Sequence, residues 1–68
     1  MFAQKLQNQA CNHCGDEELI WWTEDETETT IELYMTCDSC GYEYPKKFVK
    51  KSDDTSDAAM KERLKSML

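Results

Sequence analysis

One short pattern, Cys-x-x-Cys-Gly, occurs twice in this chain of 68 residues, as Cys11-Asn12-His13-Cys14-Gly15 and Cys37-Asp38-Ser39-Cys40-Gly41. The two copies contain all four cysteines of the chain. A two-residue spacing lets one tight turn present two sulfurs to one ion, and the glycine that follows permits the positive φ that closes such a turn. The pattern predicts one tetrahedral metal site whose ligands are Cys11, Cys14, Cys37 and Cys40.

The expected ion is a single structural Zn²⁺. Four thiolates at about 2.3 Å fill the coordination shell, so no position is left for water or substrate, and the binding energy is folding energy. Iron can occupy similar four-sulfur sites, and the sequence leaves that alternative open. His13 lies inside the first pattern, but the four cysteines already complete the shell. The four cysteines also permit three disulfide pairings, which a reducing compartment disfavours.

The length allows one small domain, whose core supplies only about 3–5 kcal/mol without a covalent or metal staple. The first ten residues lack the apolar run of a signal peptide, and no stretch approaches the roughly 20 apolar residues of a membrane span. We therefore expect a cytoplasmic protein with no membrane association. The expected organisation is a lead-in over 1–10, a zinc ribbon over 11–50, a linker over 51–56 and an amphipathic helix over 57–68.

Three strands are predicted between and after the cysteine pairs. Leu19–Thr23 is apolar, β-branched and aromatic, and Thr29–Thr36 alternates apolar and polar residues. The charged run Glu24–Glu28 between them should form a hairpin tip. Tyr42–Tyr44 can form a short third strand that ends at Pro45, which cannot donate to a ladder. The fold class expected is a three-stranded antiparallel zinc ribbon with a C-terminal helix.

The helix predicted from Asp57 to Leu68 carries an apolar stripe at i, i+4, i+7 and i+8, formed by Met60, Leu64, Met67 and Leu68. A helix of about 12 residues is marginal alone in water. The stripe should therefore pack on the ribbon, associate with a second copy or bind a partner. In the first strand, Trp21 and Trp22 should point to opposite faces, so that one joins the core and the other is left for an interface.

Two such cysteine pairs flanking a β-hairpin resemble the zinc ribbon, and the order of features is most similar to the C-terminal ribbon of transcription elongation factor S-II and the related small RNA polymerase subunits. The resemblance covers residues 11–44 and implies a polymerase as a possible partner. In that family an Asp-Glu pair on the hairpin helps to hold a catalytic magnesium ion, and Asp25-Glu26 is the candidate here. The family's preceding basic residue is replaced by Thr23-Glu24, and the pair lies farther from Cys37 than is usual. Together with the closed metal shell, this leads us to expect no enzymatic activity.

Charge decides the function that we expect. The net charge is −6, and four zinc-bound thiolates with their ion would take it to −8. No Lys or Arg lies between Lys5 and Lys46, a stretch that holds ten acids. Such a body disfavours duplex binding, which depends on phosphate neutralisation. It favours a small protein-interaction module for RNA polymerase or another nucleic-acid-binding protein. The candidate contact residues are Trp22, Glu24, Asp25, Glu26, Glu28, Met60, Leu64 and Met67.

Single-stranded nucleic-acid binding is the alternative function. Its support is a set of aromatic residues interleaved with lysines, a combination that suits base stacking and phosphate contact. The set comprises Tyr42, Tyr44, Phe48, Lys46, Lys47, Lys50 and Lys51. In the simpler interpretation the tyrosines cover the metal site, the lysines are a solvated face, and the acidic tip only keeps the chain soluble.

Overall fold

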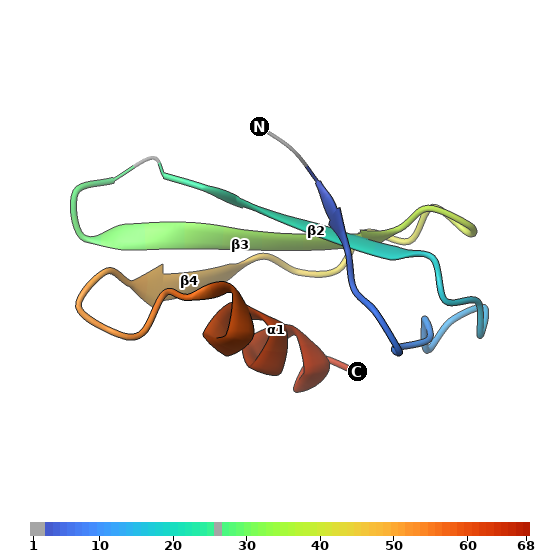
Figure 1. The fold of residues 1–68 in the computed structure, drawn as a ribbon. Coiled ribbons are helices and arrows are strands. Elements are labelled where there is room, and N and C mark those ends of the chain that lie inside the picture. Colours follow the sequence, from blue (N-terminus) through green and yellow to red (C-terminus); the bar gives the residue numbers. More distant parts are fainter. Residues whose placement is uncertain (1–2, 26) are drawn as a thin grey trace.

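The computed structural model describes residues 3–25 and 27–68. Within these residues the chain forms one antiparallel sheet of four strands, in the order β1-β2-β3-β4, and one helix (Figure 1). The strands are β1 (Gln4–Lys5), β2 (Leu19–Glu24), β3 (Thr30–Cys37) and β4 (Lys47–Lys50), and the helix is α1 (Asp57–Lys65). The two cysteine-containing turns lie at one end of the long β2–β3 hairpin, and the acidic tip lies at the other end (Figure 1).

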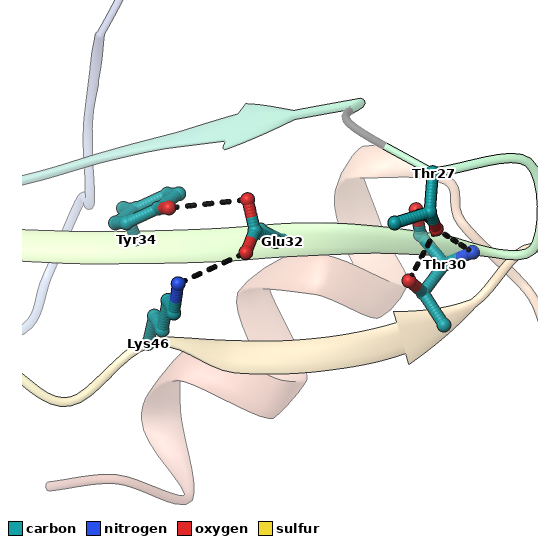
Figure 2. Close-up of polar contacts among 5 residues, drawn as sticks. All are labelled: Thr27, Thr30, Glu32, Tyr34 and Lys46. Carbon is teal, nitrogen blue, oxygen red and sulfur yellow. Dashed lines mark hydrogen bonds and ion pairs between the residues drawn. The ribbon is translucent and has the colours of Figure 1, made fainter.

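The hairpin of β2 and β3 forms where alternation and β-branching predict it. Its pairs run from Leu19↔Cys37 at the metal end to Glu24↔Glu32 near the tip. At the tip, the Thr27 hydroxyl accepts the N–H of Thr30 at 2.9 Å and donates to the carbonyl of Thr30 at 3.0 Å (Figure 2). This contact ties the turn to the first residue of β3.

The predicted third strand over Tyr42–Tyr44 is wrong, since the chain there makes only an isolated bridge, Thr36↔Glu43. Two backbone hydrogen bonds form that bridge: the N–H of Cys37 donates to the carbonyl of Tyr42 at 2.9 Å, and the N–H of Tyr44 donates to the carbonyl of Met35 at 3.0 Å. Pro45 then offers no N–H to continue a ladder. The strand beside β3 is β4, which starts beyond this proline and pairs from Leu33↔Lys47 to Thr30↔Lys50.

The fold has four strands rather than the predicted three, because the lead-in also joins the sheet. Gln4 pairs with Trp21 and Lys5 pairs with Ile20. The N–H of Leu6 then donates to the carbonyl of Leu19 at 2.8 Å, and the Leu6 side chain is buried. Since this strand has only two residues, its sequence alone carries no strand signal.

The helix begins as predicted but ends earlier, at Lys65 rather than Leu68. Ser56 caps it by accepting the N–H of Ala59, and Asp57 and Lys65 lie at the ends that suit the helix dipole. Met60 and Leu64 are fully buried, and Met67 and Leu68 are half-buried against the same core. The apolar stripe therefore packs on the core beneath the sheet.

One contiguous core lies between α1 and the sheet, and the metal site forms one end of it. Trp21, Leu33, Met35 and Val49 fill its centre, and Cys11 and Cys37 belong to the same buried cluster. The indole N–H of Trp21 is buried without a hydrogen-bond partner in the described part of the chain. Among the described residues, no helix is long and apolar enough to cross a bilayer.

Candidate metal centre

The sulfur atoms of Cys11, Cys14, Cys37 and Cys40 all lie within 4.8 Å of one another. Cys11 Sγ is 3.8 Å from Cys40 Sγ, and Cys14 Sγ is 3.5 Å from Cys37 Sγ. Four sulfurs bound to one zinc ion at about 2.3 Å in a tetrahedron would be about 3.8 Å apart. The four cysteines are therefore positioned to coordinate one metal ion, as the spacing predicts, and the all-sulfur donor set is consistent with one structural zinc.

The two cysteine turns share one backbone geometry. Gly15 has φ +81° and Gly41 has φ +78°, in the left-handed region that glycine adopts most easily. The N–H of Gly15 donates to the carbonyl of Cys11 at 2.8 Å, and that of Gly41 donates to the carbonyl of Cys37 at 2.9 Å. Backbone N–H groups in each turn also point at a sulfur, such as that of His13 at Cys11 and that of Cys40 at Cys37. The sequence repeat is thus a structural repeat that presents two sulfurs from each side.

Two contacts hold the cysteine turns against each other. The N–H of Asp38 donates to the carbonyl of Glu18 at 2.8 Å. The Ser39 hydroxyl donates to the Asp16 carboxylate at 2.6 Å. The relative position of the sulfur pairs is therefore set by protein contacts as well as by the ion that they would share.

Tyr44 supports the site from the core side. Its side chain is only 7% exposed, and its hydroxyl lies 3.4 Å from Cys11 Sγ and 2.6 Å from the side-chain oxygen of Asn12. Hydrogen bonding by this hydroxyl, together with the N–H groups of His13 and Cys14, lowers the pKa of the Cys11 thiol from 9.0 to about 6. Burial and the neighbouring Cys11 raise the pKa of Tyr44 itself to about 12. Tyr44 is therefore arranged to stabilise a thiolate at Cys11.

The exposed cysteines have the opposite tendency. The N–H of Asp16 lowers the pKa of Cys14, but desolvation and the neighbouring sulfurs outweigh it and raise this pKa to about 12. The pKa of Cys40 is raised in the same way, although the N–H of Tyr42 opposes the shift. Four thiolates this close repel one another, so only a cation among them favours full ionisation. Metal binding at this site must therefore displace protons.

His13 is exposed and is not part of the group of four sulfurs, which agrees with the expectation that the cysteines alone complete the shell. Its ring stacks on that of Tyr42, with ring centroids 3.6 Å apart. The two tyrosines that follow the second cysteine pair therefore cover the metal site, Tyr44 beside Cys11 and Tyr42 over His13. Tyr44 is buried, whereas Tyr42 is 37% exposed and its ring is stacked on that of His13, so only Tyr42 of this pair presents ring surface to solvent.

The structure separates the described candidate partner-binding residues into three groups. Trp22 is half-buried and stacks on Tyr34, and Glu24 is half-buried beside it on β2. Asp25 and Glu28 are exposed at the tip, where Asp25 pairs with Lys51 at 2.6 Å, and Glu26 lies outside the described residues. The helix residues Met60, Leu64 and Met67 contribute to the core instead, so they stabilise the domain rather than offer a free apolar face.

Sequence reasoning missed a polar network on the outer face of β3. Glu32 is only 5% exposed, and its carboxylate accepts from Lys46 Nζ at 3.0 Å and from the Tyr34 hydroxyl at 3.2 Å (Figure 2). The alternation of β3 places Glu32 and Tyr34 on the face opposite Leu33, and that pattern predicts solvent exposure for both. What it could not reveal is Lys46, which reaches over this face from the segment before β4.

A scan against protein-family models finds no match for the chain, and searches of curated proteins and of solved structures find no significant similarity.

Proposed function

We propose that this chain is a zinc ribbon in which one structural zinc, held by the four cysteines, supports a small acidic protein-interaction module. The closed four-sulfur site is the support for a structural rather than a catalytic ion, because no ligand position remains for a substrate. Iron would satisfy the same geometry. Metal analysis of the protein purified without added metal separates the two ions.

The observation that carries the interaction role is the distribution of charge. Residues 6–45 contain ten acids and no Lys or Arg, and the hairpin in this stretch joins the metal end of the sheet to the exposed acidic tip. A strongly negative surface on a rigid scaffold accelerates association with basic surfaces and repels polyanions. The partner that fits is a protein with a basic surface.

RNA polymerase is the first partner to test, because the cysteine pattern and hairpin resemble the ribbon of transcription elongation factor S-II. The family's magnesium-binding role does not follow for this chain. The carboxylate of Asp25 already pairs with Lys51, and no basic residue precedes the acidic pair. We therefore propose a binding role and no catalytic one.

Single-stranded nucleic-acid binding is the weaker alternative. Of its three aromatic residues, Tyr44 is buried, Tyr42 is 37% exposed but stacked on His13, and Phe48 is 61% exposed. Phe48 with Lys50 and Lys51 is a small surface for holding a polyanion against the net charge of −6 of this chain. Undetectable binding of single-stranded DNA or RNA at about 50 mM salt, where phosphate contacts are strong, would dismiss this alternative.

The test uses immobilised zinc-loaded protein and purified RNA polymerase, followed by capture from nuclease-treated lysate. A triple variant, Glu24→Gln, Asp25→Asn and Glu28→Gln, removes three charges near the hairpin tip. We expect one basic protein to bind, with an affinity that falls about tenfold between low and high salt and falls similarly in the variant. If nucleic acid alone is retained, or if the variant binds proteins as well as the native chain does, the acidic-module proposal is wrong.

A further inference from the structure

The outer face of the sheet has no described element packed on it, whereas α1 covers the inner face. Figure 2 shows Tyr34, Glu32 and Lys46 on the side of β3 that faces away from α1. Trp22 is paired with Tyr34 across the hairpin, and Glu43 is bridged to Thr36 two residues further along β3. Residues paired in this way share a face. We call the surface formed by Trp22, Tyr34, Thr36, Glu43 and Lys46 the open face.

The aromatic rings of the open face are held in place. The Trp22 and Tyr34 rings are stacked nearly parallel, with centroids 5.4 Å apart and an interplanar angle of 4°. The Tyr34 hydroxyl is bonded to Glu32, which also holds Lys46. Lys46 Nζ lies 5.9 Å from the centre of the Tyr34 ring and 5.4 Å from that of Phe48. One cation thus already rests on these aromatic faces, which shows that their geometry accepts positive charge.

A hollow of about 320 Å³ lies beside these rings and is lined by Trp22, Tyr34, Thr36, Glu43 and Lys46, among others. The Glu43 side chain is exposed and makes no ion pair within the described part of the chain. The hollow therefore combines flat aromatic walls, an available carboxylate and Lys46, whose charge is offset by its ion pair with Glu32. This combination suits a planar cation that can stack and donate hydrogen bonds at the same time.

Charge complementarity selects among the possible occupants. A second copy of the chain would bring another net charge of −6 against the first, and a nucleic acid would bring phosphates against a chain with ten acids and no Lys or Arg in residues 6–45. Both are opposed by the long-range field, whereas a basic protein segment is attracted by it. An arginine side chain fits the hollow better than a lysine, because its planar guanidinium stacks on aromatic rings and presents paired N–H donors to a carboxylate.

We propose that the open face binds an arginine side chain of a basic protein partner, with its guanidinium stacked on Trp22 or Tyr34 and hydrogen-bonded to Glu43. The inference rests on the proposed function and names the chemistry of its contact. The sequence already predicts Trp22 as a contact residue. Tyr34 and Glu43 are added because the fold places them beside the same hollow as Trp22.

The test titrates zinc-loaded, ¹⁵N-labelled protein with an oligoarginine peptide and with an oligolysine peptide of equal length, at low salt. The two tryptophan indole N–H signals are assigned with Trp22→Phe. Trp21 is buried on the inner face and 2% exposed, so its signal is an internal control for general unfolding. We expect the Trp22 signal to move and the Trp21 signal to stay, and the arginine peptide to bind about tenfold more tightly than the lysine peptide.

Glu43→Gln should weaken the arginine peptide about three- to fivefold. Glu17→Gln is the matched control, since it removes one exposed carboxylate beside the first cysteine turn and outside the hollow, and it should change affinity less than about twofold. Equal affinity for the two peptides, with equal effects of the two variants, would overturn the arginine site while leaving the acidic module intact. Binding of neither peptide would overturn both proposals. A Trp22 signal that moves with protein concentration alone, or further with single-stranded RNA than with peptide, would assign the open face to another occupant and refute the inference.

Discussion

Tyr44→Phe removes one hydroxyl and leaves the ring that fills the core, so it isolates the support that Tyr44 gives to Cys11. The hydroxyl lies 3.4 Å from Cys11 Sγ and is shared with Asn12 at 2.6 Å. A hydrogen bond to a charged group contributes about 1.5–3 kcal/mol, and sulfur is a weak acceptor whose share of this proton is partial. We therefore expect a loss of about 1–2 kcal/mol. Since about 1.4 kcal/mol is a factor of ten, zinc affinity should fall about five- to thirtyfold.

The assay is competition for zinc with a chromophoric chelator at neutral pH, with the fold of each loaded variant checked by circular dichroism. Tyr42→Phe is the control, because the Tyr42 ring lies next to the same site but its hydroxyl makes no hydrogen bond within the described residues. It should bind zinc within about twofold of the native chain. Equal zinc affinities for Tyr44→Phe and Tyr42→Phe would refute the role that we give to the Tyr44 hydroxyl.

Four further outcomes follow from the fold. Removing zinc with a chelator at neutral pH should abolish the sheet signal in circular dichroism, because a core of this size supplies only about 3–5 kcal/mol. Gly41→Ala should lower the free energy of unfolding of the zinc form, measured in urea, by about 1–2 kcal/mol, and Gly41→Asn should lower it less. The cost is one of backbone conformation alone, because φ is +78° and an added Cβ meets no atom within 4 Å. Leu64→Ala should cost about 2–5 kcal/mol, since Leu64 is fully buried, whereas Met67→Ala, at a half-buried position, should cost less in the same urea titration. Because the pKa of Tyr44 is raised from 10.0 to about 12, its neutral side chain stabilises the fold below pH 10, and this stabilisation is lost as the pH rises from 10 to 12. Alkaline unfolding of Tyr44→Phe, monitored by circular dichroism, should therefore lack the loss of stability that the native chain shows in this range.

The metal site could be predicted from sequence because its geometry is local. Each cysteine pair with its glycine determines one turn, and both turns adopt the expected conformation. Combining them needed only the assumption that two such turns share one ion. The β2–β3 hairpin and the start of α1 were predictable for the same reason, since alternation and capping are properties of neighbouring residues.

The remaining strands could not be predicted because their stability comes from distant partners. Tyr42–Tyr44 has strong strand propensity, but its pairing with β3 stops at the single bridge Thr36↔Glu43, and the next strand begins beyond Pro45 at Lys47. Gln4 and Lys5 have no strand signature, and they become a strand because β2 offers an edge and Leu6 enters the core. In each case tertiary pairing overrides local preference.

Glu32 shows the same limit at the level of a single side chain. Its position in the alternation of β3 predicts a solvated carboxylate, yet it is almost fully buried under Lys46 and Tyr34. A buried carboxylate is costly unless it is paired and hydrogen-bonded, and both conditions are met here. The ordered open face therefore depends on a contact between residues 14 positions apart in the chain.

Strand β3 links the predicted metal site to the open face, which contains none of the four cysteines. Cys37 is the last residue of β3 and a predicted ligand, and the same strand carries Tyr34 and Glu32 toward the acidic tip. The molecule is elongated, 35 Å along its longest axis, so the predicted ion would hold one end of the hairpin, while recognition is proposed along its length. Zinc should then act on partner binding only through the folded fraction. The Tyr44 ring lines the hollow beside the open face, and Tyr44→Phe keeps that ring. At saturating zinc, Tyr44→Phe should therefore bind the arginine peptide as the native chain does, and at limiting zinc it should bind less in proportion to its unloaded fraction. A binding defect that persists at saturating zinc would mean that the Tyr44 hydroxyl shapes the open face directly.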